Sequence, residues 1–350
     1  MKIVHAPTDL GMRAVSLSEI EQLLGCESKV IVRAPGVHVS GMVHDIYSRN
    51  RFKFAIRLFL AIKESISADL VMLNAGSSLL DFGYFGLELK DLYLYRLFNK
   101  RVITTFQGCD VRMCEMCPVR RFVSDGIVCA NVPKELSYNA FDRLKQRRLD
   151  KLSNVSEKLL GITPDLCRSD TRIQYMPHVK IVKQVGENKN KNNPTIKKIR
   201  IGHMPKHHKG TKYIEKIVSS LQSKYNEKFT YVPITGLPWV EALELMSSCD
   251  LLIDQMLMGW YGGISVEAAF LGLPSVCYVD MDLLQYVPEV MKKRLPVVAI
   301  EHRECLYDSL KELILHPEQL VLESKRCREN VEEFHDPIKI VKLILNQNRI

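Results

Sequence analysis

The sequence has no long uninterrupted apolar run. Its longest apolar segments carry a charged residue or a glycine within a few positions, so none approaches the roughly 18 residues of a membrane-spanning helix. The start, Met1-Lys2-Ile3-Val4-His5-Ala6-Pro7, is typical of a short strand before a proline and lacks the hydrophobic region of a secretory signal. These absences predict a cytoplasmic protein that is at most peripheral on the cytoplasmic face of a membrane.

Signatures of nucleic-acid binding are also missing. No zinc-finger, RRM-like or helix-turn-helix pattern occurs, although the formal net charge is +9. The basic excess therefore favours phosphate-bearing ligands or an anionic membrane surface, and we expect no nucleic-acid partner. Apolar residues make up 46% and charged residues 25% of the chain, which is the balance of a folded globular protein. A length of 350 residues suits two domains of about 150–200 residues each.

Short apolar segments alternate with longer stretches of helical periodicity, which predicts βα units and parallel sheets. The predicted strands are Lys2–His5, Lys29–Val32, Leu70–Leu73, Arg101–Thr105, Lys158–Ile162, Arg200–His203, Phe229–Val232, Asp250–Ile253, Ser275–Tyr278 and Pro296–Ile300. The predicted helices are Ala14–Leu24, Phe52–Ser65, Leu87–Phe98, Lys134–Leu152, Thr211–Lys224, Trp239–Ser247, Gly263–Leu271, Arg303–His316, Glu318–Phe334 and Pro337–Asn346.

A polar stretch from Gly186 to Pro194 interrupts this alternation and predicts a linker. We therefore expect an α/β protein with two Rossmann-like, doubly wound domains at 1–185 and 199–334, a linker at 186–198, and a terminal helix in 335–350. In such folds ligands bind at the carboxyl ends of the strands, so we predict a cleft between the facing carboxyl ends of the two sheets.

A glycine-rich segment follows one strand of the second half. Asp254-Gln255 end the strand, and Gly262-Gly263 open a helix whose first turns carry Ile264, Ser265 and Glu267. Backbone N–H groups at a helix start bind anions, and glycine lets a phosphate approach closely. A carboxylate one turn into the helix can accept hydrogen bonds from sugar hydroxyls. Glycine pairs are also common in ordinary strand–helix turns, so the segment alone indicates a ligand site only weakly.

Two lysines, Lys206 and Lys209, follow the first strand of the second half and precede a helix. Their charges can neutralise a departing diphosphate, although a solvated basic loop has the same composition. His207 and His208 lie between them. Adjacent histidines usually point apart and need further ligands, so we expect no metal ion there.

Polar residues also follow strands of the first half. Gln107, Asp110 and Arg112 follow the strand at Arg101–Thr105, while the loop with Asp9 and Arg13 follows the first strand. Strand ends of a parallel sheet gather at one edge, so we expect these side chains on the acceptor side of the cleft. Asp110 is a candidate catalytic residue, with capping of the next turn as its alternative.

Four cysteines of the chain's ten lie close together in sequence: Cys109, Cys114, Cys117 and Cys129. The two-residue gap between Cys114 and Cys117 is typical of zinc ligands, but a second such pair is missing. A structural zinc site and unligated reduced thiols are the two interpretations. Most other cysteines occur singly in apolar runs and are expected to be reduced core residues.

The predicted helix from Lys134 onward is strongly basic. It either presents a solvated face or docks on anionic lipid near a lipid-linked acceptor. The basic residues in question are Arg143, Lys145, Arg147, Arg148 and Lys151.

The stretch from Asp254 to Pro274 resembles the signature of family-four (group 1) GT-B glycosyltransferases, in which a glycine-rich loop leads to a Glu-Ala pair and then Gly-x-Pro. Its Gly259-Trp260-Tyr261-Gly262 is similar to the branch found in capsule, O-antigen and exopolysaccharide clusters. The lysine loop and the Gly-x-Asp-x-Arg at Gly108–Arg112 resemble the same family. So does Arg328–Pro337, after which the family's last helix packs back toward the first domain.

This resemblance implies a GT-B fold that binds its acceptor in the first domain and a nucleotide-sugar in the second. It implies that Glu267 binds the ribose, that the glycine-rich loop contacts donor phosphate and sugar, and that Lys206 and Lys209 stabilise the departing diphosphate. No catalytic metal or other cofactor is required. The implied reaction is a retaining transfer to a glycan or polyprenyl-linked acceptor in cell-surface polysaccharide biosynthesis.

The chain departs from this family at one position. The family has a second acidic residue eight positions before the one that matches Glu267, and here that position is Gly259. The donor sugar and the stereochemistry are therefore left open. Two alternatives remain: a sugar-nucleotide 2-epimerase of the same fold, and a catalytically silent carbohydrate-binding or scaffold subunit.

Overall fold

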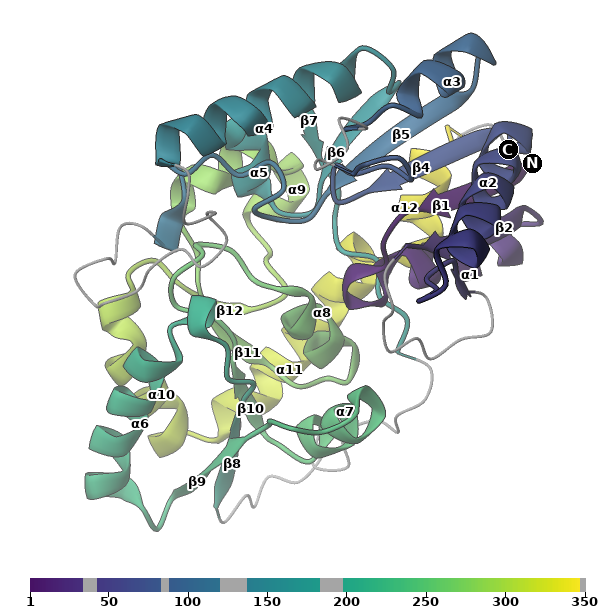
Figure 1. Ribbon diagram of the computed structural model, residues 1–350. Coiled ribbons are helices and arrows are strands. Elements are labelled where there is room, and N and C mark those ends of the chain that lie inside the picture. The colour runs from purple at the N-terminus through teal and green to yellow at the C-terminus, as the bar shows by residue number, and fades with distance from the viewer. Residues whose placement is uncertain (34–42, 83–87, 120–136, 183–197, 347–350) are drawn as a thin grey trace. The chain divides into compact units, whose positions relative to one another are not determined.

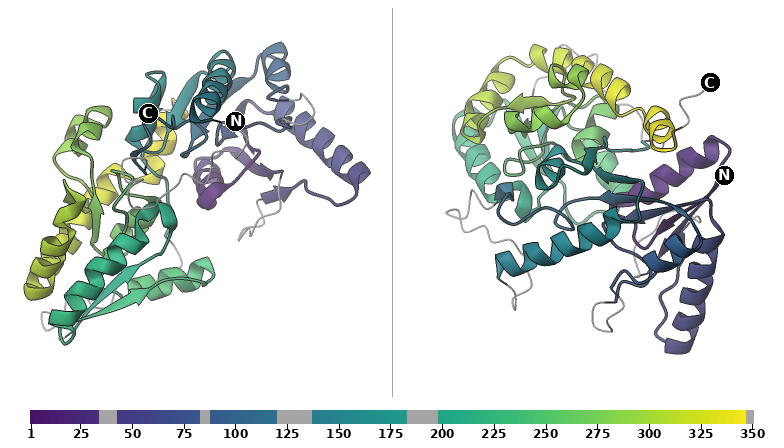
Figure 2. Two further views of the ribbon diagram at one scale, coloured as in Figure 1. Left: turned by 60° about the vertical axis from the view of Figure 1, so that its left-hand side comes forward. Right: turned by 90° about the horizontal axis from the view of Figure 1, so that it is seen from above.

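The computed structural model describes residues 1–33, 43–82, 88–119, 137–182 and 198–346 (Figures 1 and 2). The chain forms two compact units. The first comprises Met1–Met116, Ala130–Val179 and Pro337–Ile350, and the second comprises Cys117–Cys129 and Lys180–Asp336. The predicted linker lies almost entirely outside the described residues.

The first unit is built on a parallel sheet with the strand order β3-β2-β1-β4-β5-β6-β7. Its strands are β1 Lys2–Ala6, β2 Glu27–Val32, β3 Val43–Asp45, β4 Leu70–Asn74, β5 Arg101–Phe106, β6 Lys158–Gly161 and β7 Ile173–Tyr175. Its helices are α1 Arg13–Leu23, α2 Arg51–Ser67, α3 Leu92–Leu97, α4 Tyr138–Ser153, α5 Pro164–Ser169 and α12 Pro337–Ile344.

The alternation of side chains along β2 places helices on both faces of this sheet. Val30 and Val32 point to one face, where they pack with Ala14 and Val15 of α1. Ile31 points to the other face, where it joins the cluster that includes Ala61 of α2. Successive strand residues face opposite sides, so α1 and α2 cover opposite faces.

The terminal helix α12 packs in the first unit although it follows the second unit in sequence. It contacts α1. The Nζ of Lys158 on β6 donates to the carbonyl oxygens of Leu343 and Ile344, each at 3.0 Å. A cation at the C-terminal end of a helix satisfies carbonyl groups that have no partner within the helix.

The second unit contains a five-stranded parallel sheet with the order β12-β11-β10-β8-β9. Its strands are β8 Ile199–His203, β9 Phe229–Pro233, β10 Leu251–Ile253, β11 Ser275–Tyr278 and β12 Val298–Ile300. Its helices are α6 Thr211–Tyr225, α7 Trp239–Ser247, α8 Gly263–Phe270, α9 Glu289–Lys292, α10 Leu306–Leu315 and α11 Glu318–Phe334. Leu251 and Ile253 face the cluster of α6 and α10, whereas Leu252 faces that of α7 and α8.

All ten predicted strands are present, so the predicted alternation of strands and helices is confirmed. The strands β3 and β7 were not predicted. Each has three residues and lies at an edge of the first sheet, and their sequences, Val-His-Asp and Ile-Gln-Tyr, carry too few apolar residues to be recognised. Helix α3 covers only part of the predicted Leu87–Phe98. Within the described residues, no helix has the length and apolar character that crossing a membrane requires.

Candidate functional site

The second sheet changes direction between β8 and β10. These strands are neighbours, with His203 beside Ile253, but the chain leaves β8 toward β9 on one side and reaches β10 on the other. Loops that leave the carboxyl ends of two such strands diverge and open a crevice that commonly binds ligands. The two loops here carry the predicted donor-site residues of the lysine loop and the glycine-rich segment.

An ion pair joins these two loops. The Nζ of Lys209 lies 2.7 Å from Oδ1 of Asp254, and both side chains are buried. Oδ2 of Asp254 accepts hydrogen bonds from the backbone N–H of Gly262 and from Oγ of Ser265, both at 2.8 Å. Burial alone raises the pKa of Asp254, but Lys209 and these hydrogen bonds outweigh it, and the pKa lies below its ordinary value. Asp254 therefore anchors Lys209 to the start of α8.

Only some of the backbone N–H groups at the start of α8 are consequently available to bind an anion. Gly262 donates its N–H to Asp254, and the N–H of Ser265 donates to the carbonyl of Gly262 at 3.1 Å. Gly263 and Ile264 are the first two residues of the helix, and no preceding turn supplies acceptors for their N–H groups. Of the predicted phosphate contacts, these two N–H groups are the ones that the geometry favours.

Glu267 is buried on the same helix, with 4% of its surface exposed. Its Oε1 lies 2.8 Å from Nζ of Lys180, while Oε2 has no hydrogen-bond partner in the described part of the chain. Burial raises the pKa of Glu267, and the charge of Lys180 opposes that rise. A buried carboxylate oxygen without a partner is unfavourable in the absence of a ligand, which supports the predicted binding role. Lys180 was not predicted, because it lies far from Glu267 in sequence and belongs to no motif.

The lysine loop is held by a buried histidine. His203 Nδ1 lies 2.8 Å from the carbonyl oxygen of Ile253, and its Nε2 lies 3.0 Å from Oγ1 of Thr211. Burial lowers the pKa of His203 to about 4, so the ring is neutral near pH 7. Thr211 in turn contacts the backbone of Lys206, whose side chain is exposed. Lys206 and Lys209 thus differ, one being solvated and the other buried in an ion pair.

The loop after β10 has a fixed shape. Nε2 of the buried Gln255 donates to the carbonyl of Trp260, so this predicted donor-site residue holds the loop. Gly259 has a φ of +73°, and a Cβ at this position would lie 2.9 Å from Cβ of Asp280. A side chain there would be strained by the backbone and would collide with Asp280. The backbone at position 259 therefore favours glycine and disfavours an acidic residue.

Two of the first-unit candidates, Asp9 and Asp110, accept hydrogen bonds from nearby backbone N–H groups. Asp9 Oδ1 accepts the N–H of Ala14 at 2.8 Å at the start of α1. Asp110 accepts the backbone N–H groups of Gln107 and Gly108, at 2.9 and 2.6 Å. These are the contacts of a residue that holds a turn, as the alternative interpretation of Asp110 predicted.

Arg112 and Arg13 differ in their environments. Nε of Arg112 lies 2.5 Å from Oδ2 of Asp165 in a buried ion pair. Arg13 is 3% exposed, and its Nε and Nη1 have no hydrogen-bond partner in the described part of the chain. Burial lowers the pKa of Arg13 to about 9, while the charge of Asp110 raises it. Arg13 is therefore a first-unit candidate with two buried nitrogen atoms for which the described residues supply no acceptor.

The described cysteines have protein neighbours. Sγ of Cys109 lies 3.9 Å from Nη1 of Arg112, and Sγ of Cys114 lies 3.5 Å from Nζ of Lys145. Burial raises the pKa of the Cys114 thiol to about 11. Cys117 packs in an apolar cluster of the second unit. Among the described residues, no group of three or more His, Cys, Asp or Glu side chains could hold a metal ion, and Cys129 lies outside them. The zinc site stays a prediction.

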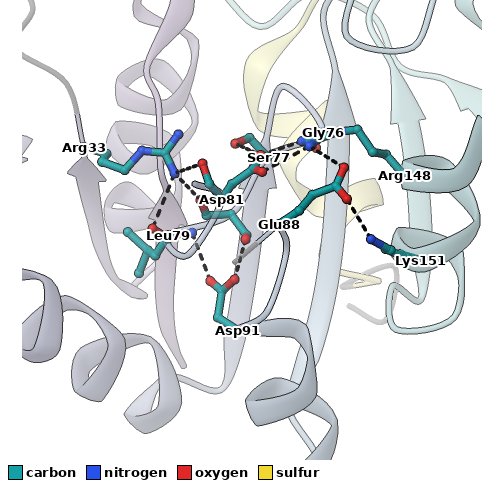
Figure 3. Close-up of polar contacts among 10 residues, drawn as sticks. Arg33, Gly76, Ser77, Leu79, Asp81, Glu88, Asp91, Arg148 and Lys151 are labelled. Carbon is teal, nitrogen blue, oxygen red and sulfur yellow. Dashed lines mark hydrogen bonds and ion pairs between the residues drawn. The ribbon is translucent and has the colours of Figure 1, made fainter. Parts of the chain in front are cut away.

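Helix α4 presents only part of the predicted five-residue basic surface, because Lys145 is buried and Arg148 is half-buried. Figure 3 shows the ion pairs of Arg148 and Lys151 with Asp81 and Glu88. Lys145 is buried and donates to the carbonyl of Arg112. Arg148 forms ion pairs with Asp81 at 2.5 Å and Glu88 at 3.1 Å, and Lys151 pairs with Glu88 at 2.8 Å. The sequence pattern showed the positive charges of α4, but it could not show that the loop after β4 and the residues before α3 neutralise them. Arg143, Arg147 and Lys151 remain exposed.

The chain matches no protein-family model and no curated protein sequence. Its fold is similar to that of several solved structures. An α-glucosyltransferase in complex with UDP and a 13-mer DNA has a TM-score of 0.62 at 10% identity, covering 99% of this chain and 98% of that one. Sucrose-phosphate synthase from Thermosynechococcus elongatus has a TM-score of 0.59 at 12% identity, covering 99% and 97%. The catalytic domain of starch synthase IV from Arabidopsis thaliana, bound to ADP and acarbose, has a TM-score of 0.56 at 10% identity, covering 97% and 99%.

These similarities confirm the predicted α/β GT-B fold. At 10–12% identity they concern the fold alone. The narrower resemblance to capsule, O-antigen and exopolysaccharide enzymes stays a prediction.

Proposed function

We propose that the chain is a glycosyltransferase that takes a sugar from a nucleotide-sugar bound in the second unit and transfers it to an acceptor bound in the first. The observation that carries this proposal is Glu267. Its buried Oε2 has no hydrogen-bond partner among the described residues, and Glu267 lies on the helix whose start has N–H groups suited to a phosphate. Two of the three similar solved structures contain a bound nucleoside diphosphate, UDP or ADP, which supports the proposal.

In the proposed donor complex, Glu267 accepts hydrogen bonds from the ribose hydroxyls through Oε2. The N–H groups of Gly263 and Ile264 bind the diphosphate. Lys209, held in place by Asp254, and the exposed Lys206 supply positive charge. Preorganised charges of this kind stabilise a leaving group most where burial excludes water, which gives Lys209 the larger role.

In the proposed reaction, an acceptor hydroxyl attacks the anomeric carbon of the donor sugar. The bond from that carbon to the diphosphate oxygen breaks, and a phosphate oxygen of the leaving group takes the hydroxyl proton. These steps need no redox partner, and the residues proposed for them include no metal ligand. We infer retention of configuration from the sequence resemblance alone. Since Gly259 excludes the second acidic residue, analysis of the product anomer is the direct test.

We propose a glycan or a polyprenyl-linked glycan of a cell-surface polysaccharide pathway as the acceptor. Arg13 supports an anionic acceptor, because its buried guanidinium has two nitrogen atoms without partners in the described part of the chain. A phosphate or carboxylate is the group that such a guanidinium binds best.

Calorimetric titration with UDP, ADP and GDP tests the donor site. We expect one of them to bind, and Glu267→Gln to weaken its affinity roughly 10- to 100-fold, because charged hydrogen bonds contribute about 1.5–3 kcal/mol. Glu244→Ala, at an exposed position of α7, is the matched control and should bind like the wild type. Failure of all three nucleotides to bind at millimolar concentration would refute the donor site.

Incubation with the donor sugar alone separates the alternatives. Conversion of the nucleotide-sugar without an acceptor would identify an epimerase. Binding without any turnover, over a panel of acceptors, would identify a silent carbohydrate-binding subunit.

A further inference from the structure

Large apolar side chains are exposed on and beside two helices of the first unit. Within the described part of the chain, three phenylalanines are exposed: Phe52, Phe59 and Phe98. Two of them lie on α2, and Phe98 directly follows α3. Phe52 is 74% exposed and Phe59 is 67% exposed. Large apolar side chains exposed singly are common, but a contiguous group usually marks an interaction surface.

Helix α2 has two apolar faces. Its inner face packs on the sheet through a cluster that contains Phe54, Leu58, Ala61 and Ile62. The exposed residues Phe52, Ile56, Phe59 and Leu60 are spaced by three or four positions or are adjacent. At about 100° per residue they fall within roughly 100° of arc, on the side opposite the inner cluster. We call these four residues the outer face of α2.

Basic residues lie on and beside this outer face, with Lys63 inside its arc and Lys53 at one edge. Arg51, Lys53, Arg57 and Lys63 are all exposed on the same helix. The acidic residue of α2, Glu64, pairs instead with Lys2 at 2.9 Å and Lys29 at 3.0 Å. An apolar face with exposed cations on and beside it, and no exposed acid on the helix, complements a bilayer whose apolar chains lie beneath anionic headgroups.

Helix α3 and the residue after it carry further exposed apolar side chains, and the chain after α3 contacts the residue that follows α2. Lys100, just after α3, donates from Nζ to the carbonyl of Ala68, just after α2, at 3.0 Å. Tyr93, Leu97 and Phe98 are exposed, with Leu97 at 75%. The exposed Arg96 adds a further positive charge.

We propose that the outer face of α2 docks on an anionic lipid bilayer, with the helix parallel to the membrane plane. Phe52, Ile56, Phe59 and Leu60 would enter the interface between headgroups and acyl chains, while Lys53 and Lys63 would contact the headgroup phosphates. This places membrane association on α2 rather than on α4. The inference deepens the proposed use of a lipid-linked acceptor, but binding to vesicles is independent of sugar transfer.

Flotation of the full chain with lipid vesicles tests this inference. We expect binding to vesicles of phosphatidylcholine with 30% phosphatidylglycerol, and little binding to phosphatidylcholine alone or in 0.5 M salt. Lys53→Gln with Lys63→Gln should weaken binding roughly 30-fold, since each charge near an anionic surface contributes about 1 kcal/mol. Phe52→Ala with Phe59→Ala should weaken it by at least about tenfold.

The matched control is Arg143→Gln with Arg147→Gln, which removes two exposed charges from α4 and should leave binding unchanged. Phe59→Trp supplies a direct probe, whose fluorescence should shift to shorter wavelength with anionic vesicles only. Absence of wild-type binding, or equal loss in the α4 control, would overturn the proposal. A dimer interface would also overturn it. Sedimentation equilibrium would then show a wild-type dimer that the Phe52→Ala, Phe59→Ala variant dissociates, while vesicle binding would be unaffected by these substitutions.

Transfer to a water-soluble acceptor separates this proposal from the proposed function. The variants of the outer face of α2 should transfer sugar to the water-soluble acceptor like the wild type. They should lose transferase activity only when the acceptor is embedded in vesicles. Vesicle binding without any transferase activity would leave the docking surface intact and refute the proposed function.

Discussion

Replacing Lys209 by methionine tests the ion pair that joins the two donor-site loops. Methionine keeps most of the apolar stem and removes the charge, so the fully buried Asp254 carboxylate retains only the hydrogen bonds from Gly262 and Ser265. Breaking a buried pair from one side typically costs about 3–5 kcal/mol, because it leaves an uncompensated charge. Since Lys209 is slightly exposed, we expect about 3 kcal/mol, which would lower the Tm of a unit of this size by roughly 6–12 °C.

A double-mutant cycle identifies the cause of this loss. Asp254→Asn alone places an amide beside the Lys209 ammonium and should also destabilise the second unit. The double variant, Lys209→Met with Asp254→Asn, removes both charges and should be more stable than the sum of the single changes predicts by at least about 1 kcal/mol. Calorimetric unfolding of all four proteins measures this. A Lys209→Met Tm within 1 °C of wild type, or strict additivity, would refute the assignment of Asp254 as the anchor of Lys209.

The same pair predicts a pH dependence. The pKa of Asp254 is lowered in the folded protein, so its contribution to stability is present above the unfolded value of about 3.9 and is lost as the pH falls through the folded pKa. In Lys209→Met the ammonium group that lowers the pKa of Asp254 is gone, whereas the burial that raises this pKa is unchanged. The pKa of Asp254 should therefore rise. The difference in stability between the two proteins should therefore shrink as the pH is lowered from 7 toward about 4. A constant difference over that range would contradict this account.

Three further predictions concern other residues of the two units. Gly259→Ala should destabilise the second unit by about 1–3 kcal/mol, because of the positive φ and the approach to Asp280, and chemical denaturation should show it. Arg13→Met should leave Tm unchanged or raise it, because a buried and poorly satisfied cation is removed, while the KM for an anionic acceptor should rise. If the cysteines bind zinc, elemental analysis of the freshly purified protein should give about one equivalent, and Cys114→Ser with Cys117→Ser should release it. Protein without metal would leave these thiols as reduced residues with protein neighbours.

Much of the fold follows from the sequence alone. The strands β4, Leu-Val-Met-Leu-Asn, and β10, Leu-Leu-Ile, are almost continuous apolar runs, because they are buried on both faces of a parallel sheet. Helix α11, Glu318–Phe334, has the bounds predicted from its periodicity. Such signals depend on neighbours within about four positions along the chain, so a single sequence contains them completely.

The chemical state of the candidate site was decided by tertiary structure. The sequence placed Lys209 and Asp254 in loops after two strands, but only the strand order brings them, 45 residues apart, to a distance of 2.7 Å. In the same way Glu267 acquires Lys180 as its partner. Arg148 of α4 pairs with Asp81, which lies 67 residues away, and no local pattern indicates that contact. The sequence shows which residues are charged or polar. Which charged side chains form ion pairs depends on which strands are neighbours in the sheets.

For the outer face of α2, too, the sequence predicts the helix and the tertiary structure determines which residues are exposed. The periodicity of residues 52–65 predicts a helix, and apolar residues occur around most of its circumference. Which of them face the sheet and which remain exposed depends on the single orientation in which Phe54, Leu58 and Ile62 fill the core beside β1 and β2. The sequence by itself determined that a helix forms there. Only packing determined that Phe52 and Phe59 are exposed, because a helix with two apolar faces can bury just one of them against its own sheet.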